Sequence, residues 1–496
     1  MEKEVFLVID LGTSCLRTLA LTREGRAVAG ARRVPRILRG EFPFILQYDV
    51  DSLTSDLYTS ISEVLEQLRG RKFSLRAIGV TAQRGGACFL DRDLNEIYVG
   101  PNIDARGFLA TIDLAEDRLR RVYESTGQYP PQLFVPGRLQ WFREYAEEES
   151  RRIAHVITLL DWVVLRLTGR VTSELSSASS TMLLDVRRRE WSKVALEAFA
   201  VDPALLAEIS EPGLVSENIS PELSRKTGLP EKTPVVVCGG DTHVASLAFG
   251  ATVTGVAGAV AGATCPVVQV LSEPRVDPEM RMWTSVHVIP GHWILESNTG
   301  RCGGVVDWFV ESLLLRPGDY EYFDELVLSS PPGSRGVRFK HGASVMNARK
   351  TGEQDVDIYV RVPEFSLHEE QVAIRDVARS LLESISYSVR ANYEQLRSVS
   401  GAASPFFGVT GGLTRLQSFR KILPAVMGFE TRFTRQHNGT ALGCLALTMQ
   451  ALGEFRSVGE AVAAVSDVEG VRPPEGECQE YNTLYYNWLE FYREVI

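Results

Sequence analysis

The sequence predicts an α/β protein built from two domains. Apolar segments that end in glycine turns and lead into helical segments occur in both halves of the chain. This repeated unit is typical of sheets that are covered by helices. The chain has 496 residues, and at roughly 100–200 residues per domain this length suits two or three domains.

The first predicted element is a β-hairpin, in which two apolar runs flank a polar turn within residues Val5–Leu21. A similar hairpin, Gly258–Val270, occurs half a chain later, where Gly262 follows Gly12 by 250 residues. Two similar hairpins at this spacing suggest two related halves. Strands rich in glycine and alanine are common, however, so unrelated halves are an open alternative.

The remaining elements are expected where apolar residues recur at helical spacing or where short apolar runs end at glycine. In the first half they are helices at Asp51–Leu68, Arg138–Tyr145 and Asp161–Leu167, and strands at Ala77–Val80 and Pro234–Cys238. In the second half they are helices at Val372–Leu396 and Thr440–Leu452, and a strand at Phe407–Val409. We expect the division near residues 245–255, which gives domains 1–248 and 249–496.

Composition excludes several classes of protein. The net charge of −10 argues against nucleic-acid binding, because such proteins carry a basic domain or stripe. The seven cysteines form no CxxC pair, so we expect reduced thiols in a cytoplasmic protein. The segment Ala245–Ser272 has no charged residue, and its length would suit a helix that spans a membrane. Its glycine content and Pro266 favour a buried strand–turn–strand unit instead, and no membrane contact.

The turn of the first hairpin is a candidate phosphate site. Gly12, Thr13 and Ser14 offer backbone N–H groups and hydroxyls, which together suit a phosphate. Asp10 at the strand end could hold Mg²⁺, because this hard cation prefers oxygen ligands, and Arg17 could face phosphate oxygens. The alternative is an ordinary hairpin with a polar tip.

Two further glycine turns follow buried strands. Asp241 comes after Gly239-Gly240, where a carboxylate could accept a proton from an alcohol that attacks a phosphoryl group. It could equally cap the helical segment that follows. Gly411-Gly412 would let a base or ribose approach the backbone closely, or would form a strand–helix turn that merely needs glycine.

Two loops carry polar side chains suited to a polyhydroxylated small molecule. Gln83 and Arg84 lie in the first loop, and Asn102, Asp104 and Arg106 lie in the second. A salt-bridged loop would explain Asp104 and Arg106 equally well. The sequence has no convincing metal-binding spacing, no Walker A motif and no GxGxxG after the first strand.

The order of these motifs resembles the FGGY family of carbohydrate kinases, of the actin/hexokinase/Hsp70 superfamily. Asp10-Leu-Gly-Thr-Ser14 with Arg17 looks like the first phosphate motif, and Gly240-Asp241 falls where the family carries its catalytic aspartate. The second phosphate motif is matched by Gly262, Ala263 and Thr264, and the adenosine motif by Gly411, Gly412 and Leu413. Thr440-Ala-Leu-Gly443 is similar to a string that follows the adenosine motif in the family.

The resemblance implies two actin-like (ribonuclease H-like) domains with a ligand cleft between them. It implies ATP and Mg²⁺ as cofactors, with Mg²⁺ near Asp10, and Asp241 as the general base for attack of a substrate hydroxyl on the γ-phosphate. The residues expected to contact a small sugar or polyol are Gln83, Arg84, Asn102, Asp104, Asp241 and Thr242. A homodimer is an expectation from the family alone.

Departures from the family bear on the substrate. Gln83-Arg84 resembles glycerol kinase, but Gly85 replaces the glutamate expected next, and the Gln-Met-His of xylulokinases is missing. The segments 101–106, 126–128, 276–280 and 287–291 look closest to the autoinducer-2 kinase branch, which phosphorylates a linear five-carbon hydroxyketone. That branch has Met-Arg-Glu where this chain has Gln83-Arg84-Gly85, so the sugar pockets differ in sequence. Our hypothesis is an ATP-dependent kinase of a small linear polyol or ketose, and a ketopentose such as xylulose or ribulose is the favoured substrate.

Other functions stay open at this point. They are an autoinducer-2-type kinase, a polyol or glycerol-like kinase, and a non-catalytic nucleotide-dependent sugar sensor. The sensor is suggested by Ala263, which replaces the usual threonine, and by Asn438, which replaces an acidic residue. A nucleotide-dependent switch of the actin or Hsp70 type is disfavoured, because such a protein has no need of a sugar-activating base at Asp241.

Overall fold

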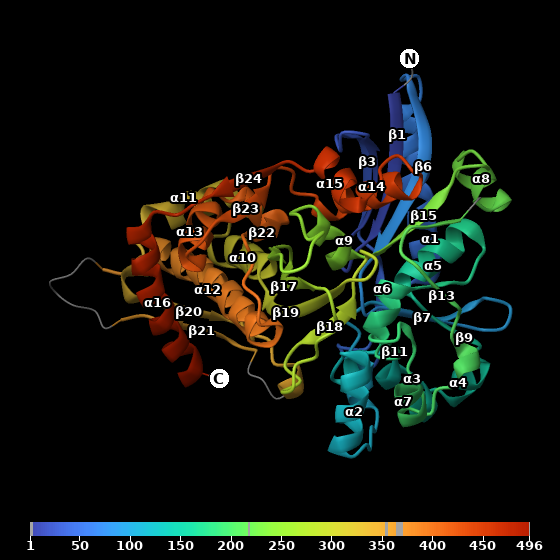
Figure 1. Ribbon diagram of the computed structural model, residues 1–496, viewed down its shortest axis with the longest axis horizontal. Coiled ribbons are helices and arrows are strands. Elements are labelled where there is room, and N and C mark those ends of the chain that lie inside the picture. Colours follow the sequence, from blue (N-terminus) through green and yellow to red (C-terminus); the bar gives the residue numbers. More distant parts are fainter. Residues whose placement is uncertain (1–2, 217–218, 353–355, 364–370, 496) are drawn as a thin grey trace.

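The computed structural model describes residues 3–216, 219–352, 356–363 and 371–495 (Figure 1). Each half of the chain forms one large mixed sheet with helices packed on it. In Figure 1 the first sheet lies on the right with β1 and β6, and the second lies on the left with β22 and β23. The predicted two-part α/β organisation is confirmed.

The first sheet has six strands in the order β14-β15-β6-β1-β2-β3. Their bounds are β1 Lys3–Leu11, β2 Leu16–Thr22, β3 Ala27–Arg33, β6 Phe73–Ala82, β14 Leu214–Ser216 and β15 Val235–Gly240. β1 pairs in parallel with β6, and β6 pairs in parallel with β15, while the β1–β2–β3 meander and the β14–β15 pair are antiparallel.

The second sheet has seven strands in the order β18-β19-β17-β16-β22-β23-β24. Their bounds are β16 Ala257–Val260, β17 Thr264–Leu271, β18 Trp283–Val286, β19 Trp293–Arg301, β22 Phe407–Thr410, β23 Thr431–Thr434 and β24 Val468–Val471. The hairpin β16–β17 continues into β19, and β16, β22 and β23 are parallel. Apart from the additional edge strand β18, this sheet has the strand order and strand directions of the first sheet read from β3 to β14. The two halves therefore share a topology, as the matching hairpins suggested.

Short strands complete the chain in small sheets. They are β4 Ile37–Arg39, β5 Leu46–Tyr48, β7 Ala87–Leu90, β8 Glu96–Gly100, β9 His155–Thr158, β10 Ser173–Glu174, β11 Leu184–Asp185, β12 Glu190–Trp191, β13 Ile209–Ser210, β20 Arg338–His341 and β21 Ile358–Arg361.

The five helices with predicted bounds, 51–68, 138–145, 161–167, 372–396 and 440–452, are present with ends that differ by a few residues. The other helices, apart from the one that begins at Asp241, were not predicted. The helices of the first half are α1 Val50–Leu68, α2 Glu116–Thr126, α3 Val135–Tyr145, α4 Glu147–Arg152, α5 Leu159–Thr168, α6 Leu175–Ala178, α7 Lys193–Ala198, α8 Pro221–Thr227 and α9 Asp241–Leu247. Those of the second half are α10 Gly303–Trp308, α11 Tyr320–Ser329, α12 Ile374–Ser400, α13 Gln417–Met427, α14 Gly439–Ala451, α15 Val458–Val465 and α16 Glu475–Glu494.

Local sequence explains the ends of these helices. Asp49 caps α1 by accepting a hydrogen bond from the Ser52 backbone N–H, which satisfies one of the free donors of the first turn. Thr158 and Asp161 form a reciprocal capping box at the start of α5, and Gly169 ends that helix in the left-handed conformation. Each helix end is thus set by residues adjacent to it in the chain.

Helices α14 and α15 belong to the second half of the chain but pack on the first sheet (Figure 1). Side chains of α14 and α15 form one buried cluster with Phe6, Val8 and Val236 of that sheet. At Gly443 in α14, a side chain of any size would overlap the carbonyl oxygen of Val244 in α9. Glycine at this position therefore allows α14 to cross α9 at close range.

The uncharged segment 245–272 forms the end of α9 and the hairpin β16–β17. This confirms the predicted strand–turn–strand unit. Within the described ranges, no helix combines the length and the apolar character that crossing a bilayer requires. All seven cysteines are free thiols, and six of them are buried.

Candidate active site

A cavity of about 250 Å³ lies where the two halves of the chain meet. Its walls come from the turn after β1, the loops after β6 and β15, and strands β17, β18 and β19. Because β1, β6 and β15 are parallel, their carboxyl ends bring these loops to one edge of the sheet. The lining includes residues singled out in the sequence: Thr13, Arg84, Asn102, Asp241, Thr242 and Thr264.

Asp241 is the first residue of α9, and 30% of its side chain is exposed toward this cavity. Its Oδ1 accepts a hydrogen bond from the Thr242 backbone N–H at 2.7 Å. Burial raises the pKa of Asp241, and the nearby Arg84 guanidinium opposes that shift. The N-cap of α9 is Gly240, without a side-chain cap, so the alternative that Asp241 serves as the cap is wrong.

Arg84 is fixed by partners from both halves of the molecule. Its Nη2 lies 2.6 Å from Oε2 of Glu296 in β19, and its Nε lies 3.9 Å from Oδ1 of Asp241. Its Nη1 lies 3.4 Å from Nε2 of His243, whose pKa is held well below its ordinary value by burial and by Arg84. The neutral imidazole therefore accepts this hydrogen bond.

Gln83 lies behind the cavity wall and is almost fully buried. Its Oε1 accepts hydrogen bonds from the Asn102 backbone N–H at 3.0 Å and the Thr13 hydroxyl at 3.3 Å. Its Nε2 donates to the Tyr48 hydroxyl at 2.7 Å. Gln83 therefore positions Asn102 and Thr13, which do line the cavity.

The prediction that Asp104 contacts the substrate is wrong. Its carboxylate has no exposure, and its Oδ1 accepts a hydrogen bond from the Leu46 N–H at 2.8 Å. Its Oδ2 accepts from the Tyr98 hydroxyl at 2.6 Å and from Arg106 Nε at 2.7 Å. A carboxylate engaged on both oxygens inside the fold has nothing left for a ligand, so the salt-bridged loop was the right alternative.

Asp10 stands at the end of β1 with Arg17 beside it, 3.8 Å from Arg17 Nη1 to Asp10 Oδ2. Its Oδ1 is buried and has no hydrogen-bond partner within the described part of the chain. Burial raises the pKa of Asp10 to about 7, with Arg17 lowering it and Asp241 raising it. A buried carboxylate oxygen without a partner, close enough to Asp241 for that charge to act on it, suits a bound cation. Ser14, in the same turn, is exposed.

The other two glycine turns contact each other. Gly411 has φ +110°, and a Cβ there would lie 2.5 Å from the Ala261 carbonyl oxygen. The Leu413 N–H donates to that same oxygen at 3.1 Å. The turn at Gly262 and Ala263 also accepts hydrogen bonds from the N–H groups that begin α10, including Gly303 N–H to Gly262 O at 3.0 Å. Two motifs almost 150 residues apart in the chain thus form one surface, with Gly412 open and Leu413 mostly buried.

Sequence reasoning missed several lining residues. Glu296 and Asn298 come from β19, and Trp283 comes from β18. The only sequence signal for Glu296 is a lone acidic residue after the apolar run Trp293-Ile-Leu295. The partner that reveals its role, Arg84, lies more than two hundred residues earlier.

Comparisons with known proteins cover both halves of the chain. Models of the FGGY family of carbohydrate kinases match residues 5–248 with the N-terminal domain and residues 257–452 with the C-terminal domain. The chain is 24% identical to an autoinducer-2 kinase of Klebsiella pneumoniae over 510 aligned positions, covering 99% of this chain and 94% of that protein. An autoinducer-2 kinase of an Enterobacter species is 25% identical over the same coverage.

Solved structures share the fold. A xylulose kinase from Lactobacillus acidophilus superposes with a TM-score of 0.86 at 17% identity, covering 99% of this chain and 98% of that one. A Plasmodium falciparum glycerol kinase with ADP gives 0.84 at 18% identity, with 98% of each chain covered. Both are consistent with an actin-like two-domain architecture. The protein therefore belongs to the FGGY family of carbohydrate kinases, enzymes that use ATP to phosphorylate a small sugar.

Proposed function

We propose that the protein transfers the γ-phosphate of ATP to a hydroxyl of a small linear sugar, most favourably a ketopentose such as xylulose or ribulose. The observation that carries this proposal is the position of Asp241, which is partly exposed in a cavity shared by Thr13 of the first turn and Thr264 of the second. Asp241 would accept the proton of the attacking hydroxyl. Arg84 beside it opposes the effect of burial and so favours the ionised, basic form.

The lining of the cavity supports an uncharged substrate. Arg84 is the one cationic side chain among the described lining residues, and it already faces Asp241 and Glu296. An acidic sugar would find no unpaired cation there. Asn102, Asn298 and Glu296 offer hydrogen-bonding groups to hydroxyls, and Trp283 offers an apolar face to the carbon chain.

Nucleotide binding would use the glycine turns. We assign the phosphates to Gly12, Thr13, Ser14 and Arg17 and to Gly262, Ala263 and Thr264, and adenosine to the surface at Gly411, Gly412 and Leu413. On this assignment residues 1–248 carry the sugar site, the first turn and the base, and residues 249–496 carry the second turn and the adenosine site.

Asp10 would hold Mg²⁺, and its unpartnered Oδ1 suits this role. Mg²⁺ in kinases is held by one or two carboxylates together with substrate phosphates. When bound, it neutralises charge on the phosphates.

An autoinducer-2-type kinase is the second candidate. It is favoured by relatives of that name which match 99% of this chain. A linear five-carbon hydroxyketone is also uncharged and of similar size to a ketopentose, so the same cavity would suit it.

The test is a coupled ADP-release assay with Mg²⁺-ATP across pentuloses, polyols, glycerol and the autoinducer-2 precursor. We expect strong turnover of one five-carbon compound and a loss of roughly 10²–10⁴-fold in kcat for Asp241→Asn. The exposed Asp113→Asn protein is the control. Turnover that survives in Asp241→Asn would contradict the role of the base. No turnover of any compound in the panel, with ATP binding intact, would leave two alternatives: a substrate outside the panel, or a sugar sensor without catalytic activity.

A further inference from the structure

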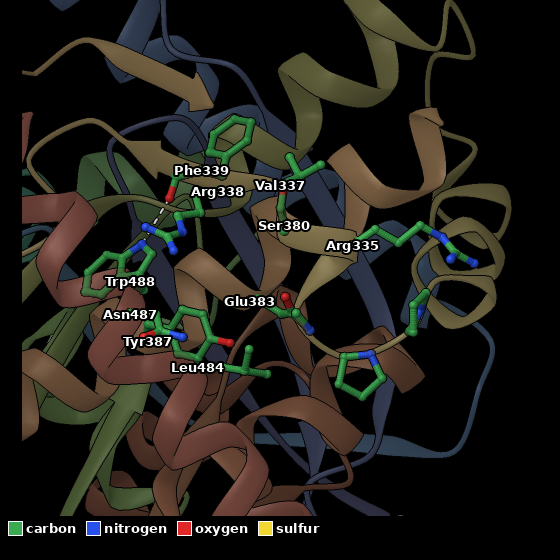
Figure 2. A pocket seen from close by; sticks show the side chains of 14 residues that line it. Arg335, Val337, Arg338, Phe339, Ser380, Glu383, Tyr387, Leu484, Asn487 and Trp488 are labelled. Carbon is green, nitrogen blue, oxygen red and sulfur yellow. Dashed lines mark hydrogen bonds between the residues drawn. The ribbon is translucent and has the colours of Figure 1, made fainter. Parts of the chain in front are cut away.

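A second cavity, of about 290 Å³, lies within the second half of the chain (Figure 2). This cavity is open to solvent on one side and is lined by β20, by one face of α12 and by α16, together with the segment that precedes β20. None of its lining residues belongs to the cavity that holds Asp241. The kinase reaction as proposed above gives this second cavity no role.

Tyr387 of α12 contributes a buried donor to this cavity. Its side chain is 4% exposed, and its hydroxyl has no hydrogen-bond partner within the described residues. In Figure 2 the hydroxyl points inward among the lining side chains, on the side of Leu484 and Glu383. A buried hydroxyl without a partner is unfavourable, and burial raises the pKa of Tyr387 well above its ordinary value, so the group stays a donor. A ligand oxygen would satisfy it.

Arg338 contributes an unpaired charge. No hydrogen bond or ion pair involves its guanidinium within the described ranges, although it is partly buried. Its neighbours differ: Arg379 Nε is 2.8 Å from Glu383, and Arg361 Nη2 on the paired strand is 2.7 Å from Glu494. The cavity therefore presents a cation that the protein itself leaves uncompensated.

Glu383 does not balance Arg338, because its oxygens are already in use. It accepts hydrogen bonds from Arg379 Nε at 2.8 Å, from the Ser334 hydroxyl at 2.8 Å and from the Gly333 N–H at 3.1 Å. Its side chain is also almost fully buried. The cavity can therefore accommodate a negative charge beside Arg338 and a hydrogen-bond acceptor beside the Tyr387 hydroxyl.

Much of the remaining wall is apolar, although Ser380, Asn487 and Arg335, which lies 3.5 Å from Asp376, also line the cavity. Trp488 donates its indole N–H to the Phe339 carbonyl oxygen at 3.0 Å and stacks on Tyr492 at 5.2 Å between ring centres. With its polar atom occupied, Trp488 offers only ring surface to the cavity. Leu484 and the two prolines Pro331 and Pro332 extend this apolar surface.

We propose that this cavity binds a small organic anion with an aromatic or apolar body. Its carboxylate pairs with Arg338, a second oxygen accepts a hydrogen bond from Tyr387, and its body packs against Trp488 and Leu484. The first two contacts engage groups that have no partner among the described residues, and the apolar contacts use side-chain surface that lines the cavity. The proposal is independent of which sugar the kinase uses.

The test uses 4-hydroxyphenylacetate as the probe on the full-length protein, with binding measured by saturation-transfer NMR and titration calorimetry. We expect saturable binding below ~5 mM and binding of the neutral amide analogue weaker by about tenfold. Arg338→Gln should weaken the acid by about tenfold and leave the amide unchanged. Tyr387→Phe, which removes only one oxygen, should weaken both compounds by about threefold or more.

Two control variants test whether the probe binds in this cavity and not elsewhere on the protein. Arg361→Gln removes the same charge from the neighbouring strand and should leave binding unchanged, as should Asp241→Asn in the other cavity. Absence of saturable binding up to ~20 mM would overturn the proposal, since weaker affinity is no specific site. Binding of the acid that is undiminished in the Arg338 and Tyr387 variants, or that is lost in Asp241→Asn, would also overturn it.

Discussion

The guanidinium of Arg84 lies between two carboxylates, 3.9 Å from Asp241 and 2.6 Å from Glu296. Its charge opposes the rise that burial causes in the pKa of Asp241. In Arg84→Gln we therefore expect the pKa of Asp241 to rise further. Asp241 would then stay protonated to higher pH, and the acid limb of the kcat profile would move to higher pH.

The measurement is kcat against pH for the wild type and the Arg84→Gln protein, with the exposed Arg187→Gln as the control. Because kcat is measured at saturation, weaker sugar binding alone would not shift this limb. An acid limb at the same pH in both proteins would show that Arg84 does not tune the base.

Asp10 makes the stability of the ligand-free protein depend on pH. Its pKa is about 7 in the folded state against an ordinary 3.8, so between these values the folded state binds more protons than the unfolded state. The free energy of unfolding must then fall as pH rises from about 4 to 7. Asp10→Asn should remove this contribution, on the order of 1–4 kcal/mol.

Urea unfolding at pH 5 and pH 8 without Mg²⁺ measures the effect, and Asp113→Asn is the matched surface control. Asp161, whose pKa burial also raises to about 7, contributes in the same direction and remains in both variants. Mg²⁺ should stabilise the wild type more at pH 8 than at pH 6, because it binds the ionised carboxylate. An equal pH dependence in wild type and Asp10→Asn would contradict the assignment.

The main strands, the glycine turns and five helices were predictable, and individual contacts were not. The apolar spacing of α1 is a local signal that the sequence shows directly, whereas α2, α11, α13 and α16 were not predicted. Asp104 could not be placed, because its partners Leu46 and Tyr98 are fixed only when distant segments fold together. Glu296 was missed for the same reason.

The crossing of α9 and α14 depends on one missing side chain. A Cβ at Gly443 would overlap the Val244 carbonyl oxygen, so Gly443→Ala must separate the helices. We expect a loss of about 1–3 kcal/mol in the free energy of unfolding. Gly476→Ala in α16, where nothing lies within 4 Å of the added methyl group, should be neutral or stabilising by about 0.5–1 kcal/mol. Urea unfolding of both variants checks this, and equal effects would contradict the packing argument.

At the scale of the whole molecule, the sequence predicted two related halves from one pair of hairpins, and the shared strand order of the two sheets supports that duplication. The sequence did not predict that α14 and α15, which belong to the second half of the chain, pack on the sheet of the first half. The segment Thr440–Leu452 is apolar along its length. Both the first and the second sheet offer an apolar face to such a helix, so the sequence of this segment does not indicate on which sheet the helix packs.

The placement of α14 and α15 means that neither half is a self-sufficient folding unit. Residues 1–248 expressed alone would expose the apolar surface around Phe6, Val8 and Val236 that these helices cover, and we expect this fragment to aggregate. Co-expressed with residues 249–496, it should be recovered as a soluble complementing pair on size-exclusion chromatography. A monomeric, cooperatively folded 1–248 fragment would contradict this. If the chain were divided after residue 248, the second polypeptide would supply helices α14 and α15, which complete the hydrophobic core of the first.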